Sequence, residues 1–344
     1  MKHLLNTLYV TTQGAYVHKD GEAAVVQVNQ QVRLRVPIHT LGGLVCFGQV
    51  LVSPPLMELC CERGVSISFF SEHGRFHARV EGPISGNVLL RREQYRKADS
   101  PASSAAIARA SVAAKVLNCR SVLLRALRDH ADLPEQPRVQ AAADRLSRVA
   151  EQLQQENLSL DAARGLEGDA SAAYFGVLDH LVTAQKEAFF FNERTRRPPL
   201  DNLNALLSFI YTLLAHDCRA ALESVGLDPQ VGFLHRERPG RPSLALDVME
   251  EFRPFLADRL ALSLVNLRQV QGSGFRTAES GAVQMDDATR KALLIAYQKR
   301  KQEEILHPFL NEQAPIGLLP FLQARLLARH IRGDLDAYPP FIWK

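Results

Sequence analysis

The sequence lacks the cysteine spacing of a zinc knuckle or a disulfide framework. Its five cysteines are an odd number, and no two of them form a Cys-x-x-Cys pair. They therefore indicate reduced thiols in the core or on the surface, as is typical of a cytoplasmic protein. The first residues contain no apolar run of signal-peptide length, and no stretch reaches the roughly 18 apolar residues of a membrane span. We expect a soluble, cytoplasmic protein without a membrane partner.

The sequence also lacks motifs for nucleotide cofactors and for serine hydrolysis. Gly240, Gly272 and Gly274 have neither the spacing of a phosphate-binding loop nor a strand before them. No serine stands in a nucleophile-elbow context. The net charge is only +4 at pH 7, so a nucleic-acid surface would have to come from local basic clusters.

The composition changes near residue 100, and 344 residues suffice for two domains. We predict an α+β fold with a β-rich N-terminal domain at 1–98 and a larger helical domain at 99–344. A helix at 54–63 interrupts the strands, with Ser53 as its cap and Gly64 as its stop. The other segments are too short and too closely spaced for βαβ units, which favours a mostly antiparallel sheet domain. The predicted strands are 7–11, 15–18, 23–28, 32–38 and 65–70.

After residue 100 almost every segment has helical periodicity. Breaks fall at Pro134, Pro137 and the Pro198-Pro199 pair. Residues 272–281 are glycine-rich and indicate a loop or a small hairpin. The predicted helices lie at about 103–130, 138–156, 160–190, 200–224, 287–304 and 316–331.

Residues 235–254 carry the clearest chemical pattern. His235 precedes a loop rich in Pro, Gly and Arg, and a helix starting at Ser243 places Asp247 and Glu250 one turn apart. An imidazole with clustered carboxylates suits Mn²⁺ or Mg²⁺. The same spacing also fits a capped, solvated helix face without a metal. Pro254 should kink or end the helix, because it denies the Glu250 carbonyl its intrahelical partner.

Basic side chains surround this acidic group, which suggests a phosphodiester substrate. Each of them could equally belong to a solvated helix face. The candidates for phosphate contacts are Arg236, Arg238, Arg241 and Arg253, then Arg194, Arg196 and Arg197, and then Lys299, Arg300 and Lys301 next to Tyr297.

A further ligand is needed from elsewhere, and the candidate is Glu167 in the segment 165–175. Glycine in a helix interior costs about 1 kcal/mol relative to alanine, so Gly165 and Gly168 predict that something approaches the backbone closely. The alternative is that both glycines allow two helices to pack tightly and that Glu167 lies on the surface.

Three segments together resemble the CRISPR-associated integrase that captures new spacers. They are Gly-x-Glu-Gly at 165–168 continuing to Tyr-Phe at 174–175, Arg-Pro-Pro-x-Asp-x-x-Asn-x-Leu-Leu-Ser-Phe-x-Tyr at 197–211, and Gly-Phe-Leu-His with Leu-Asp-Val-Met-Glu-Glu-Phe-Arg-Pro within 232–254. The resemblance covers essentially the whole chain and is strongest to members of type I (I-C-like) systems.

The resemblance implies a catalytic site with Glu167, His235 and Glu250 as Mg²⁺ or Mn²⁺ ligands and Asp247 supporting them. It implies an endonuclease and integrase that inserts short DNA fragments into a CRISPR array by 3′-hydroxyl attack on a phosphodiester. It also implies a homodimer held largely by the β domain, and a heterohexamer with a small second adaptation protein around a short duplex. Two alternatives remain: a metal-dependent repair or recombination nuclease that never integrates, and a non-catalytic DNA-binding scaffold.

Overall fold

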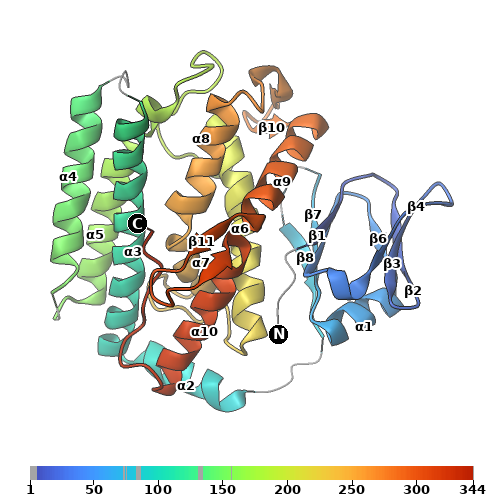
Figure 1. The fold of residues 1–344 in the computed structure, drawn as a ribbon, viewed down its shortest axis with the longest axis horizontal. Helices are drawn as coiled ribbons and strands as arrows, with labels where there is room; N and C mark the ends of the chain where they lie inside the picture. The colour runs from blue at the N-terminus through green and yellow to red at the C-terminus, as the bar shows by residue number, and fades with distance from the viewer. Residues whose placement is uncertain are drawn as a thin grey trace. The chain divides into compact units, whose positions relative to one another are not determined.

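The computed structural model describes residues 6–72, 74, 76–82, 87–130, 135–155 and 157–343. The chain forms two compact units, 1–86 and 87–344, of which the first is β-rich and the second mostly helical (Figure 1). The predicted α+β class is confirmed. The division falls before helix α2 (Val88–Asp99), which we had assigned to the β-rich domain and which belongs to the helical unit.

The first unit contains two four-stranded sheets, ordered β1-β5-β7-β8 and β4-β3-β2-β6. One 3₁₀ turn, η1 (Ile38–Thr40), and one helix, α1 (Pro54–Arg63), lie between the strands in sequence. The strands are β1 (Thr7–Val10), β2 (Tyr16–Asp20), β3 (Ala23–Val28), β4 (Gln31–Pro37), β5 (Gly43–Phe47), β6 (Leu51–Val52), β7 (Ser66–Phe70) and β8 (Phe76–Val80).

Both sheets are mixed, so the prediction of mostly antiparallel pairing was wrong. β5 runs parallel to β1 and β7, and β6 runs parallel to β2. Only β2 with β3, β3 with β4, and β7 with β8 pair antiparallel. We had not predicted β5. It lies between β1 and β7, which come from distant parts of the sequence, and it runs parallel to both.

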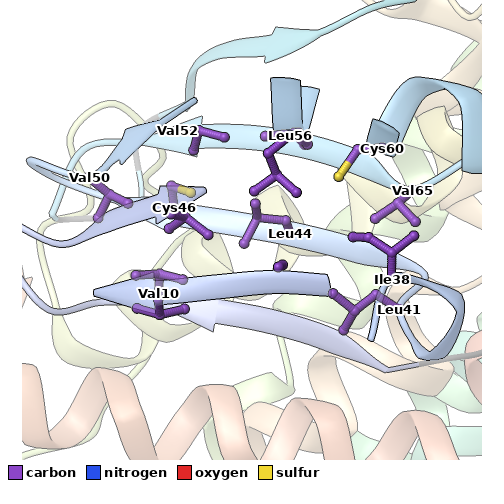
Figure 2. Packing of buried hydrophobic residues seen from close by; sticks show 14 of the residues in the cluster. Val10, Ile38, Leu41, Leu44, Cys46, Val50, Val52, Leu56, Cys60 and Val65 are labelled. Atoms are coloured by element: carbon purple, nitrogen blue, oxygen red, sulfur yellow. The ribbon is translucent and has the colours of Figure 1, made fainter. Parts of the chain in front are cut away.

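Helix α1 begins and ends where predicted, and its apolar side chains form part of the core of this unit. The Ser53 hydroxyl accepts a hydrogen bond from the Leu56 N–H at 3.4 Å, and Gly64 ends the helix with φ of 68°. The buried face of α1 packs with apolar side chains of both sheets (Figure 2). The core residues labelled there are Val10, Ile38, Leu41, Leu44, Cys46, Val50, Val52, Leu56, Cys60 and Val65.

The second unit is a helical assembly in which α3 packs against α4, α5 and α7 (Figure 1). The predicted helix at 160–190 was too long, because α5 ends at Phe175 and a 3₁₀ turn, η2 (Leu178–Leu181), follows. The helices after α2 are α3 (Pro101–Asp129), α4 (Gln136–Gln152), α5 (Leu160–Phe175), α6 (Asn202–Ser224), α7 (Ser243–Glu250), α8 (Arg259–Asn266), α9 (Asp287–Gln302) and α10 (Leu319–Arg332).

The shorter elements of this unit connect the helices. A π-helical turn, η3 (Arg253–Asp258), follows α7, as the position of Pro254 suggested. The glycine-rich interval forms the hairpin β9 (Phe275–Thr277) and β10 (Val283–Met285), one of the two predicted options. The remaining pieces are β11 (Glu304–Leu306), β12 (Gln313–Pro315), η4 (Gly272–Gly274) and η5 (Ile316–Leu318).

Helix α6 is long and apolar enough to cross a membrane by length and composition, which the sequence analysis had not recognised. Leu203, Leu206 and Ile210 on this helix are fully buried inside the protein. The helix packs against α7, α10 and η3. Its apolar composition is therefore accounted for by its place in the core.

Candidate active site

The loop before α7 wraps around the carboxylate of Asp247. Oδ2 accepts the backbone N–H of Phe233 at 2.6 Å and of Leu234 at 2.9 Å, and Oδ1 accepts the N–H of His235 at 3.0 Å. The residue before them has to be glycine, because a Cβ on Gly232 would lie 2.7 Å from Oδ2. Asp247 is only 3% exposed, so these bonds replace water and fix the loop on the helix.

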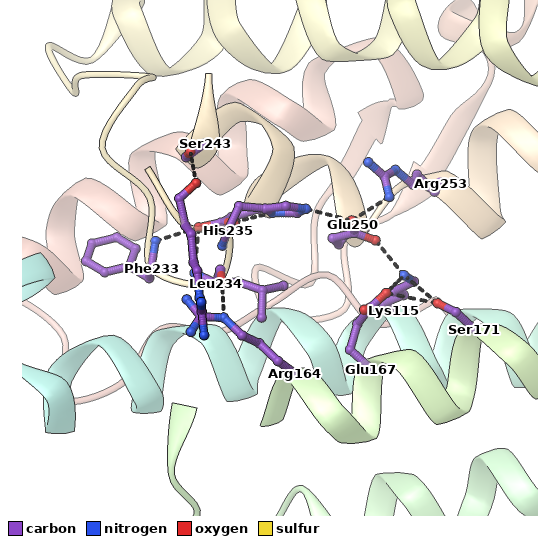
Figure 3. Close-up of polar contacts among 12 residues, drawn as sticks. Lys115, Arg164, Glu167, Ser171, Phe233, Leu234, His235, Ser243, Glu250 and Arg253 are labelled. Carbon is purple, nitrogen blue, oxygen red and sulfur yellow. Dashed lines mark hydrogen bonds and ion pairs between the residues drawn. The ribbon is translucent and has the colours of Figure 1, made fainter. Parts of the chain in front are cut away.

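Asp247 also orients the imidazole of His235. Nδ1 lies 2.6 Å from Oδ1 of Asp247. A carboxylate only accepts hydrogen bonds, so Nδ1 carries a proton, and the neutral form of the ring has its lone pair on Nε2. Nε2 faces Oε1 of Glu250 at 3.6 Å (Figure 3). The sequence alone does not identify Asp247 as the residue that orients the His235 ring.

Two carboxylates from different helices converge on one cation, Lys115 of α3 (Figure 3). Its Nζ forms an ion pair with Oε1 of Glu167 on α5 and lies 2.9 Å from Oε2 of Glu250 on α7. Ser171, one turn after Glu167, holds both partners: its hydroxyl donates to Glu167 at 2.9 Å and accepts from Nζ at 3.0 Å. α3, α5 and α7 thus bring their charged groups to one buried point.

The charges at this point stabilise one another. Burial alone would raise the pKa of Glu250, but Arg253 and Lys115 outweigh burial and lower it to about 2. Burial alone would lower the pKa of Lys115, but Glu250 and Glu167 outweigh burial and raise it. Both groups are therefore charged at neutral pH although each is buried.

A small cavity adjoins the carboxylates, and basic and aromatic side chains line it. The guanidinium groups of Arg194 and Arg253 each lie 5.2 Å from the centre of the Tyr211 ring. The Tyr211 hydroxyl donates to Asp258 at 2.6 Å. Burial, with Asp258 nearby, raises the pKa of Tyr211 well above its usual value, so the hydroxyl stays protonated. Lys115 and Ser171 line the same cavity.

The next carboxylate along the chain, Glu251, has a different environment and a structural role. It accepts hydrogen bonds from the Tyr338 hydroxyl at 2.6 Å and from the Phe341 N–H at 2.8 Å. Burial raises the pKa of Glu251 to about 7. Glu251 fastens the C-terminal segment to the end of α7, whereas Glu250 faces His235 and Lys115.

The predicted basic residues are spread over several environments. Arg253 pairs with Glu250, and Arg194 donates to Ser208 at 3.1 Å. Lys301 is buried and lies 2.9 Å from Asp217, so it does not form an exposed patch with Lys299. Arg236 pairs with Asp161, and Arg300 pairs with Glu303. Five of the predicted basic side chains form no ion pair with another described residue, and all are exposed except Arg241, which is half-exposed. They are Arg196, Arg197, Arg238, Arg241 and Lys299.

The alternative interpretation of the glycines in α5, that they let two helices pack tightly, was wrong, and the close approach of another molecule stays a prediction. A Cβ placed on Gly165 or on Gly168 would meet no atom within 4 Å. No helix packs tightly there, and nothing in the described protein approaches the backbone. Glu167 is partly buried rather than on the surface, with 28% of its side chain exposed.

The sequence analysis missed Lys115, which lies at the centre of the site. A signal was present: Val112, Ala114, Val116 and Cys119 around it are all buried, so this lysine lies on the apolar side of a helix. A lysine in that position needs a carboxylate partner.

The donor set fits a hard divalent cation. Glu167 and Glu250 supply oxygens, the neutral form of His235 supplies a nitrogen donor, and the carboxylates already converge on a positive charge. Oε2 of Glu250 is buried and accepts no well-directed hydrogen bond from the described residues, even from Lys115 at 2.9 Å. Within the described ranges no three His, Cys, Asp or Glu side chains surround one point; Lys115 lies between the carboxylates instead.

Comparison with known proteins identifies the family. A family described as CRISPR associated protein Cas1 matches residues 8–299. A CRISPR-associated endonuclease Cas1 of Chlorobaculum tepidum is 52% identical over 344 residues, covering 100% of both chains. Another, from Rhodospirillum rubrum, is 54% identical over 347 residues, again covering 100% of both chains.

Solved structures agree on the fold. A CAS1 protein from Thermotoga maritima has a TM-score of 0.80 at 22% identity, covering 98% of this chain and 100% of that one. A casposase bound to integration product has a TM-score of 0.82 at 20% identity, covering 98% and 94%. The chain therefore belongs to the Cas1 family of CRISPR-associated endonucleases.

Proposed function

We propose that this protein is a metal-dependent DNA integrase and endonuclease that inserts short DNA fragments into a CRISPR array as new spacers. The observation that carries the proposal is the convergence of Glu167 and Glu250 on one cation beside His235, whose Nε2 faces Glu250 at 3.6 Å. Glu167, His235 and Glu250 would hold Mg²⁺ or Mn²⁺. The endonuclease names of the relatives, and the casposase with integration product among proteins of this fold, support the reaction class.

The reaction is a transesterification. The 3′ oxygen of the incoming fragment forms a new P–O bond, and the P–O bond to the leaving strand of the array breaks. The proton of the attacking hydroxyl is lost to solvent, and the leaving 3′ oxygen gains one. One phosphodiester replaces another, so no ATP is needed; water as the attacking group gives strand cleavage. The bound cation supplies charge that stabilises the phosphorane-like transition state and favours ionisation of the nucleophile.

The protein's own residues position the reactants. Asp247 holds His235 in the tautomer that presents Nε2 to the site. Arg253 contacts both Glu250 and the Tyr211 ring, and it also lines the small cavity. Arg194 and Arg196 line the same cavity, which gives a phosphate three guanidinium partners there.

Arg238 and Arg241 are the proposed phosphate contacts of the loop before α7. The Arg238→Glu/Arg241→Glu protein should bind a short duplex about ten-fold or more weakly at low salt, with a flatter dependence of log Kd on log salt. Fluorescence anisotropy over a salt series measures both quantities. The matched control is Arg128→Glu/Arg138→Glu, two side chains that are each 70% exposed on other helices. An unchanged salt slope excludes the loop arginines as phosphate contacts.

We further propose a cytoplasmic homodimer that joins a small second CRISPR adaptation protein in a heterohexamer on DNA. In a Cas6-RT-Cas1–Cas2 complex, 36% of one chain matches this fold, with a TM-score of 0.81. If the β-rich unit carries most of the dimer contact, residues 87–344 alone should be monomeric while the full chain is a dimer. Light scattering of both proteins measures the masses, and a dimer of residues 87–344 contradicts the assignment.

Strand transfer tests the function. A fluorescent duplex is incubated with a supercoiled repeat plasmid, the purified protein and its small partner in Mn²⁺, Mg²⁺ or EDTA. Metal-dependent joining supports the integrase. Cleavage without joining favours a repair or recombination nuclease, and DNA binding indifferent to metal favours a scaffold.

A further inference from the structure

The position of Lys115 is unusual for a site that takes a cation. Its side chain is 7% exposed and its Nζ lies between the carboxylates of Glu167 and Glu250, the same two groups that would bind the metal. Ser171 holds Nζ from a third direction at 3.0 Å. A lysine and a divalent cation cannot both occupy the point between these carboxylates.

We propose that Lys115 is a built-in competitor of the metal: it holds the ligand carboxylates together when no metal is bound and is displaced when the metal enters. The inference rests on the proposed metal site. Without a cation, the buried carboxylate of Glu250 and the partly buried carboxylate of Glu167 repel, and a buried charge without a partner is strongly destabilising. The ammonium group removes both penalties in the metal-free protein.

The surroundings of Lys115 provide a place for the displaced ammonium. Lys115 and Ser171 both line the cavity that also contains Arg194, Arg196 and Arg253. Four flexible carbons let Nζ turn from the carboxylates toward this cavity without moving α3. Nζ then adds a fourth positive charge where a DNA phosphate would lie. Metal entry is thereby coupled to phosphate binding, because each favours the same position of the lysine.

The test measures metal affinity and stability rather than activity. Lys115→Met keeps an unbranched side chain that is one heavy atom shorter and removes its charge. It should bind Mn²⁺ about ten-fold or more tightly than the unchanged protein, because the metal no longer displaces a competing cation. In EDTA, the melting temperature of Lys115→Met should be lower than that of the unchanged protein. In Mn²⁺, most of this difference between the two proteins should disappear. Calorimetric titration and thermal melts of the full chain measure these quantities.

Lys301→Met is the matched control. Lys301 is also buried and pairs with a carboxylate, Asp217, at 2.9 Å, but on α9 and α6 away from the ligands. Its replacement should lower the melting temperature equally in EDTA and in Mn²⁺ and leave the Mn²⁺ affinity unchanged. Lys115→Gln provides a second variant, which keeps a hydrogen-bond donor and lacks the charge.

The outcomes separate this inference from the proposed function. If both Lys115 variants bind Mn²⁺ as tightly as the unchanged protein or more weakly, and His235→Ala does not bind it, Lys115 is not a competitor of the metal. The proposed metal site then remains supported. If neither the unchanged protein nor the Lys115 variants bind Mn²⁺, both the competitor role of Lys115 and the proposed metal site are overturned. Variants that fold only in Mn²⁺ support the inference. Variants that remain unfolded in millimolar Mn²⁺ overturn it, since the metal then does not replace the lysine.

Discussion

Glu167→Gln, His235→Ala and Glu250→Gln should each lower strand transfer by about a thousand-fold or more, because each removes the charge or the donor atom of one of the three proposed metal ligands. The three ligands come from α5, the loop before α7 and α7 itself. A glutamine amide oxygen is a weaker donor than a carboxylate, and alanine has no donor atom. The rate of product formation in single-turnover joining assays, at saturating Mn²⁺, measures the loss.

A matched carboxylate on the same helix serves as the control. Asp169 lies two residues after Glu167 and pairs with Arg145 at 3.0 Å on the surface. Asp169→Asn should join DNA at the unchanged rate. Joining at near the unchanged rate by any of the three ligand variants would remove that residue from the site.

Asp247→Ala should lower the free energy of unfolding by about 3 to 5 kcal/mol. The substitution leaves the N–H groups of Phe233 and Leu234, which are buried, and of His235, which is partly buried, without their acceptor. It also frees the His235 ring, so strand transfer should fall by about ten- to a hundred-fold even in the folded fraction. Urea denaturation and the joining assay measure the two effects separately.

The control for Asp247→Ala is the replacement of an exposed carboxylate. Asp161 is 73% exposed and pairs with Arg164 at 2.8 Å. Asp161→Ala should leave the free energy of unfolding essentially unchanged. An Asp247→Ala protein as stable as Asp161→Ala would show that the carboxylate does not hold the loop.

Local features of the fold could be predicted from the sequence, and long-range ones could not. The ends of α1 follow from Ser53 and Gly64, because caps depend on a few neighbouring residues. The parallel position of β5 between β1 and β7 has no comparable local signal. α5 was predicted too long because the apolar periodicity continues past Gly176 into η2.

The same distinction applies to the candidate site. Glu167, His235, Asp247 and Glu250 were found through motifs, and the structure brings Asp247 to His235 and Glu250 to the facing side of the ring. Their roles in catalysis remain predictions. Lys115 belongs to none of the motifs, since its partners lie on other helices far along the chain. The sequence signal for Lys115 was that a charged residue lies among apolar residues on one side of a helix.

The claim on which the other predictions depend is the position of the cation. Crystals of the full chain soaked in Mn²⁺ give an anomalous difference map at the manganese edge. We expect one strong peak in contact with Glu167, Glu250 and Nε2 of His235, with Lys115 turned toward the adjoining cavity. A fully occupied manganese elsewhere, with Lys115 still between the carboxylates, would contradict the proposed centre.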